Sequence, residues 1–145
     1  MARSGPVLVV GYDGSATAQA AARYAAARAG GDGTLFVVHA YGPPPDWMGR
    51  PGYDLMLHEH QRRGREILDA LDLGAGVPVE TELIGDQPVD AILSVADARH
   101  ADEIVVGSRG FGRVRAILGS VSHDLLHRAS VPVVVIPAAP EADEG

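Results

Sequence analysis

The chain has 145 residues, of which 46% are hydrophobic and only 5% are aromatic, and its formal net charge at pH 7 is −7. This length suits one domain whose core is built from Val, Ile, Leu and Ala, a composition typical of buried parallel strands packed against helices. Because there is no cysteine, disulfides and thiolate metal sites are excluded. The acidic balance argues against non-specific binding to nucleic acids or anionic membranes. All twelve basic residues are arginine, which excludes any mechanism that requires lysine.

The beginning of the chain predicts a strand and a turn rather than a targeting segment. Residues 7–10 form a short apolar run closed by Gly11, typical of a fully buried strand. A signal peptide would need an apolar stretch of about 7–15 residues, and a membrane helix one of about 20. Neither occurs, so we expect a cytoplasmic protein that does not bind membranes. Asp13-Gly14-Ser15 then turns the chain, and either Asp13 or Ser15 can cap the following helix.

The remaining elements alternate between helices and strands. Alanine content, apolar stripes and a proline suited to a first helical turn predict helices over residues 16–29, 55–71, 88–99 and 120–127. Strands are predicted over residues 35–38, 77–84, 103–107 and 133–136, and the alternation in 77–84 is typical of an edge strand. Residues 41–53 contain four prolines and three glycines and are predicted to be irregular.

This order predicts an α/β fold: a single doubly wound five-stranded parallel sheet with helices on both faces. We assign residues 1–140 to this domain and residues 141–145 to a flexible acidic tail. Ligands bind such sheets beyond the carboxyl ends of the strands, where the strand order reverses. If the first strand lies beside the fourth, the loop 11–15 and the segment that begins at Gly107 meet there.

Glycine, serine and arginine gather between residues 107 and 122. Glycines let backbone N–H groups approach an anion, and a helix that begins at Ser120 presents free N–H groups to it. Three arginines add positive charge, at positions 109, 113 and 115. A phosphate cradle is one interpretation, and a flexible connector before an ordinary serine-capped helix is the other. The P-loop pattern is excluded because it requires lysine, and Gly11-Tyr12-Asp13-Gly14 does not match a dinucleotide fingerprint.

Four segments resemble the universal stress protein family. Gly-x2-Gly-x8-Gly-Ser at residues 107–120 resembles the family's ATP-binding signature, Gly-x2-Gly-x9-Gly-Ser/Thr, with a spacer one residue shorter. Residues 11–15 (Gly-Tyr-Asp-Gly-Ser), 37–40 (Val-Val-His-Ala) and 131–137 (Val-Pro-Val-Val-Val-Ile-Pro) extend the resemblance over nearly the whole chain. It implies an adenine nucleotide alpha hydrolase-like fold with strand order 3-2-1-4-5. It also implies ATP accompanied by Mg²⁺ or Mn²⁺, and a homodimer formed through the C-terminal strand.

The resemblance further implies roles for individual residues. Asp13 would contact the nucleoside, Ala40 would meet the adenine edge through its backbone, and Val106 would line the base pocket. The residues that would surround the phosphates are Gly107, Gly110, Gly119, Ser120, Val121 and Ser122. The alternative for Asp13 is a turn-forming helix cap.

Three other aromatic or imidazole features leave alternatives open. His123 and His127 lie four residues apart and could chelate a metal, but a solvent-facing pair is the simpler interpretation. His39, at a strand end, has an ordinary hydrogen-bonded role or lines the pocket. Trp47 covers the nucleotide as a lid or packs on the surface.

The function implied by the resemblance is an ATP-binding regulatory module of the stress response. No residue is visibly placed as a general base for attack by water, so we expect at most slow ATP hydrolysis. Two alternatives remain. One is a dimeric interaction protein of the same fold that does not use nucleotide, and the other is an enzyme acting on a nucleotide-like substrate.

Overall fold

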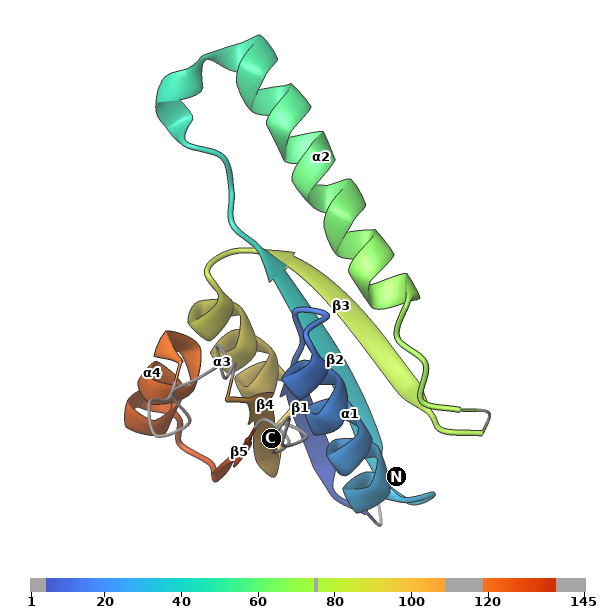
Figure 1. Cartoon of the computed structure of the whole chain (residues 1–145). Helices are drawn as coiled ribbons and strands as arrows, with labels where there is room; N and C mark the ends of the chain where they lie inside the picture. The colour runs from blue at the N-terminus through green and yellow to red at the C-terminus, as the bar shows by residue number, and fades with distance from the viewer. Residues whose placement is uncertain (1–4, 75, 109–118, 138–145) are drawn as a thin grey trace, which may run out of the picture.

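Five short strands form one parallel sheet in the order β3-β2-β1-β4-β5, as the resemblance implied (Figure 1). The computed structural model describes residues 5–74, 76–108 and 119–137. The strands are β1 (Val7–Gly11), β2 (Thr34–Tyr41), β3 (Val79–Gly85), β4 (Glu103–Gly107) and β5 (Val133–Ile136). The helices are α1 (Ala16–Ala29), α2 (Arg50–Asp69), α3 (Pro88–Ala98) and α4 (Ser120–Arg128), with a short 3₁₀ turn, η1 (Asp46–Met48).

The sheet separates the core into two layers, and its central strand β1 contributes side chains to both. Strand β1 pairs with β2 on one side and β4 on the other, so the strand order reverses at β1 and β4. Its side chains alternate between the two faces of the sheet. Leu8 and Val10 pack with α1 and Leu68 of α2, whereas Val7 and Val9 pack with α3 and Leu125 of α4. The crevice expected between the first and fourth strands therefore exists at their carboxyl ends.

Helix α1 lies close to the sheet because its buried face consists mainly of alanine. Ser15 caps the helix, since its Oγ accepts the N–H of Ala18 at 3.2 Å. Gly30 ends it with a φ of 62°, which a residue with a Cβ rarely adopts. The bounds Ala16–Ala29 match the prediction for residues 16–29.

The prediction that residues 41–53 are irregular is wrong at both ends. Tyr41 belongs to β2, and α2 begins at Arg50 rather than at residue 55. Proline is tolerated in the first helical turn, where an N–H has no partner within the helix, so Pro51 does not prevent the helix from starting. Gly49, with a φ of 79°, makes the turn into it. The irregular part is confined to residues 42–45 and Gly49, either side of η1.

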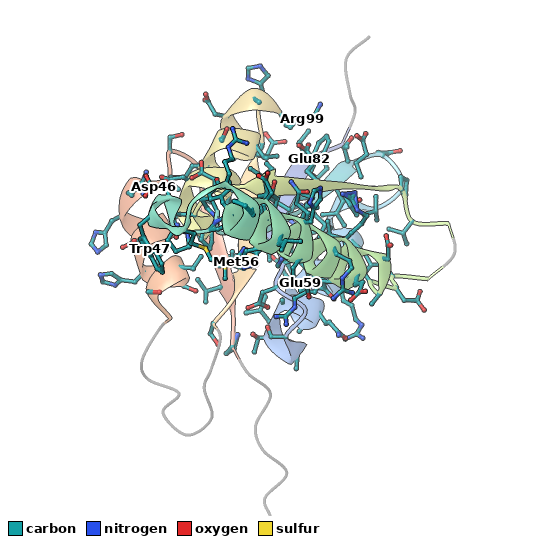
Figure 2. The ribbon with its side chains drawn as sticks, turned by 90° about the horizontal axis from the view of Figure 1, so that it is seen from above. Asp46, Trp47, Met56, Glu59, Glu82 and Arg99 are labelled. Carbon is teal, nitrogen blue, oxygen red and sulfur yellow. The ribbon has the colours of Figure 1, made fainter. Side chains whose placement is uncertain are left out.

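The N-terminal half of α2 projects beyond the sheet (Figure 1). Only Gly64 and Leu68 of this 20-residue helix are buried. Arginine and glutamate pairs one turn apart stabilise its surface, as between Arg62 and Glu59. Figure 2 looks down on this projecting end, where Trp47 is 81% exposed. Among the described residues no helix combines the length and the apolar character needed to span a membrane.

Candidate functional site

A pocket opens at the carboxyl ends of β1, β2 and β4, where the crevice was expected. The empty space within it and at its open mouth is about 510 Å³. Its wall is mainly apolar, and its polar side chains include Asp13 and Ser15 of the β1–α1 turn, Thr17 of α1 and His39 of β2. The described residues that line it are Gly11, Tyr12, Asp13, Ser15, Thr17, Ala18, Val38, His39, Ala40, Pro88, Ile92, Val106, Gly107 and Val121.

The β1–α1 turn brings Asp13 to the pocket. The Tyr12 N–H donates to the Val38 carbonyl at 2.8 Å, which continues the β1–β2 pairing by one residue. Asp13 Oδ1 accepts the N–H of Ser15 at 2.9 Å, so Asp13 forms the turn while Ser15 caps the helix. The Asp13 side chain is exposed and lines the pocket as well. Its two interpretations, turn former and pocket residue, are therefore compatible.

Tyr12 is buried beneath this turn, 4% exposed. Its burial, and then the nearby Asp13 carboxylate, raise the pKa of the Tyr12 phenol above its ordinary value. Both effects disfavour a phenolate, so Tyr12 stays neutral at physiological pH. It contributes a packed wall rather than a charge.

The floor of the pocket requires a glycine at position 107. A Cβ built on Gly107 would lie 2.5 Å from Thr17 Oγ1 and 2.7 Å from the Thr17 carbonyl carbon. Only a residue without a side chain allows the end of β4 to approach the first turn of α1 this closely. Gly107 therefore allows the end of β4 to lie in direct contact with the start of α1, and both elements line the pocket.

The start of α4 lies beside this floor. Gly119 precedes the helix in an extended conformation, and its N–H donates to the Ser108 carbonyl at 3.2 Å. No side chain caps α4 within the described residues. The N–H groups of Ser120, Val121 and Ser122 belong to the first turn, where an α-helix leaves its N–H groups without intrahelical partners. These groups and the helix dipole favour an anion.

Ser122 differs in placement from its neighbours. Its side chain is 1% exposed, and its Oγ donates to the Gly107 carbonyl at 3.1 Å. The hydroxyl proton thus connects α4 to the end of β4. Ser120, by contrast, is exposed at the first helical position.

The structure brings five of the expected site residues to the pocket wall: Asp13, Ala40, Val106, Gly107 and Val121. Gly119, Ser120 and Ser122 are adjacent, at the start of α4. Gly110 and the three arginines at positions 109, 113 and 115 lie outside the described residues. Sequence reasoning did not single out Tyr12, Thr17, Pro88 or Ile92, which also line the pocket. Tyr12, Thr17 and Pro88 lie next to a strand end or in a first helical turn, a positional signal that was available.

The structure also places the tryptophan and the histidines for which the sequence left two roles open. Trp47 is not among the described lining residues and is exposed, whereas His39 both lines the pocket and makes a hydrogen bond. His123 and His127 are exposed, with ring centroids 4.6 Å apart. Within the described ranges no group of three His, Asp or Glu side chains could hold a metal ion.

Comparison with known proteins decides the family, because a family model described as the universal stress protein family matches residues 7–137. The chain belongs to the universal stress protein family. A universal stress protein of Thermus aquaticus is 38% identical over 132 residues, which cover 89% of this chain and 96% of that protein. One from Mycobacterium tuberculosis is 32% identical over 144 residues, covering 94% of its length. The chain spans only 47% of a third relative, from Mycolicibacterium smegmatis, which is 32% identical.

Solved structures of universal stress proteins share the fold. One in complex with cAMP has a TM-score of 0.59 and 26% identity, covering 91% of this chain and 96% of its own. One from Archaeoglobus fulgidus in complex with dAMP has a TM-score of 0.58 and 27% identity, covering 93% and 99%. The protein UspA from Lactobacillus plantarum has a TM-score of 0.74 at 23% identity, covering 94% and 99%. The first two are complexes with adenine nucleotides.

Proposed function

We propose that this universal stress protein binds an adenine nucleotide, with ATP as the favoured ligand, in the pocket at the carboxyl ends of β1, β2 and β4. The observation that carries the proposal is the meeting of three features at one crevice. An apolar wall that includes Val38, Ala40 and Val106 lies next to the Asp13 carboxylate and to the N–H groups that begin α4, which have no partner within the helix. Two structural relatives more than 25% identical to this chain hold cAMP and dAMP, which supports the same ligand class here.

Each feature matches one part of such a nucleotide. The base would lie against the apolar wall, with the Ala40 backbone at its polar edge. The ribose hydroxyls would donate to Asp13, whose negative charge repels phosphate and so fixes the direction in which the nucleotide enters. The phosphates would lie at Gly107 and the start of α4, where backbone N–H groups favour anions. Mg²⁺ or Mn²⁺ would be held mainly by the phosphate oxygens, as these ions usually are with nucleotides.

The same proposal makes the protein a regulatory module of the stress response whose state is set by nucleotide occupancy. We expect hydrolysis that is slow at most, because Asp13, the one carboxylate among the described lining residues, already accepts the Ser15 N–H and serves the nucleoside. A turnover assay that follows release of phosphate from ATP tests this part.

Thermal unfolding with and without ligand tests binding. A ligand at 100 times its dissociation constant stabilises the folded state by about 2.7 kcal/mol. For a domain of this size the melting temperature then rises by about 6–10 °C. ATP with Mg²⁺, AMP, cAMP and GTP are compared, and we expect the adenine nucleotides to stabilise the fold more than GTP. Asp13→Asn should reduce the shift, whereas Asp32→Asn, a change in an exposed acidic residue outside the pocket, should not. An unchanged melting temperature at millimolar concentrations of all four ligands contradicts the proposal.

We also propose that β5 forms the contact of a homodimer. It lies at the margin of the sheet and pairs with β4 alone among the described strands. The Pro132 carbonyl accepts the N–H of Ile104 in β4, and the Ile136 carbonyl accepts the N–H of Ser108, the residue after β4. The N–H and C=O groups of successive residues in a strand point to opposite sides in turn. Those of Val133 and Val135 therefore point away from β4, to the outer edge of the sheet. An unpaired edge of this kind is a template for another strand.

Native mass spectrometry tests the dimer and reports any co-purified nucleotide in the same measurement. Val135→Pro removes an outward N–H while leaving the hydrogen bonds to β4, so we expect the variant to be monomeric and folded. A monomeric mass for the unaltered chain at tens of micromolar would exclude the dimer.

A further inference from the structure

A histidine ring links α2 to the turn that carries Asp13. His39 Nδ1 lies 2.7 Å from the carbonyl oxygen of Tyr12. A carbonyl oxygen can only accept a hydrogen bond, so the proton must lie on Nδ1. In the neutral ring Nε2 is then unprotonated.

This hydrogen bond fixes more than Tyr12. The Tyr12 carbonyl belongs to the peptide group whose nitrogen is that of Asp13, and a peptide group is planar. Holding the carbonyl therefore holds the direction in which the Asp13 backbone leaves the strand. The Tyr12 N–H is already held by the Val38 carbonyl at 2.8 Å. Two consecutive residues of β2 thus secure both polar groups of Tyr12.

The opposite side of the ring is enclosed by α2. A Cβ on Gly64 would lie 3.0 Å from His39 Cδ2 and 2.5 Å from Leu83 Cδ1. Gly64 is one of the two buried residues of the helix, so α2 lies close against the sheet beside the histidine ring. The ring is held between the helix and the turn.

We propose that His39, as the Nδ1–H tautomer, is the positioning residue that sets the orientation of Asp13 for nucleoside binding. The inference rests on the proposed function, in which Asp13 accepts the ribose hydroxyls. His39 acts through the Tyr12–Asp13 peptide, and the phosphate end of the pocket does not depend on it.

Two substitutions of similar size separate this role from a general contribution to packing. The amide nitrogen of asparagine occupies about the position of Nδ1 of histidine, whereas that of glutamine lies near Nε2. His39→Asn should keep the affinity for adenosine, AMP and ATP within about threefold of the unaltered chain. His39→Gln should weaken all three by about tenfold, the loss expected for one hydrogen bond to a positioned group. The factor should be the same for all three ligands, because the turn contacts the nucleoside part that they share.

A second measurement, on the unaltered protein without nucleotide, decides the tautomer. Long-range ¹H–¹⁵N correlation spectra distinguish a protonated Nδ1 from a protonated Nε2, and we expect the proton on Nδ1 of His39. Because this measurement uses the unaltered protein, its result does not depend on whether the variants fold. A proton on Nε2, or equal affinities of the two variants, overturns the inference while leaving nucleotide binding intact. An unaltered chain that binds neither adenosine nor ATP overturns the proposed function and, with it, this role for His39.

Discussion

Replacing Gly107 by alanine tests how the floor of the pocket is built. The new Cβ would meet backbone and Cβ atoms of Thr17 at 2.7 Å and its Oγ1 at 2.5 Å, so β4 or the start of α1 must shift. Overpacking of this kind costs about 1–3 kcal/mol. With an unfolding entropy of about 0.3 kcal/mol/K for a chain of this length, the melting temperature should fall by about 3–10 °C.

Two further glycines provide matched controls. At Gly11 the nearest atom is the tip of the Ile92 side chain, at 2.5 Å, which can rotate away, and at Gly31 nothing lies within 4 Å. All three substitutions stiffen the unfolded chain equally, which stabilises by about 0.4–1 kcal/mol, so differences between them report the contacts alone. In thermal unfolding followed by circular dichroism, Gly31→Ala should have the highest melting temperature, Gly11→Ala an intermediate one and Gly107→Ala the lowest. If Gly107→Ala is as stable as Gly31→Ala, the close approach of β4 to α1 is not as described.

Three other changes test the framework of the site. Ser15→Ala removes the cap of α1 and should lower the free energy of unfolding by about 0.5–2 kcal/mol in urea titrations, with Ser94→Ala on the exposed surface as the control. Leu125→Ala leaves a cavity where α4 meets the core and should cost about 2–5 kcal/mol in the same assay; a loss below 1 kcal/mol would mean that α4 is not packed there. Because the pKa of Tyr12 is higher in the folded than in the unfolded chain, its contribution to stability is complete below about pH 10 and is lost as the pH rises through the folded value. Urea titrations from pH 9 to 11 should therefore show a decline that is smaller in Tyr12→Phe.

The strands could be predicted because each is marked by a short apolar run that is local in sequence. Residues 7–10, 104–106 and 133–136 are apolar runs followed by glycine or proline, a pattern typical of strands in a parallel sheet. The alternation of strands and helices leaves few topologies. The strand order that sets the first strand beside the fourth, and with it the crevice, came from the resemblance to the family and is confirmed. The turn at Asp13 and the cap at Ser15 are equally local.

The rest depended on contacts between distant parts of the chain. Prolines read as a break in residues 41–53 were compatible with a helix start, because Pro51 falls in a first turn. The partner of His39 is 27 positions away in the sequence, and no periodicity indicates it. The resemblance places Ser122 among the residues around the phosphates, but it does not indicate that the Ser122 hydroxyl donates to the Gly107 carbonyl, a contact that depends on how closely α4 approaches β4.

The projecting half of α2 also means that the chain can be opened there without dismantling the sheet. Fragments 1–49 and 50–145 would each keep whole strands, and they would meet along β1 with β4 and along the full length of β3 with β2. We therefore expect the two pieces, produced separately, to reassemble into a complementing pair. Association of the two fragments would then require β1 to pair with β4, the pairing that forms the crevice. Binding between the fragments would therefore measure whether the crevice can assemble.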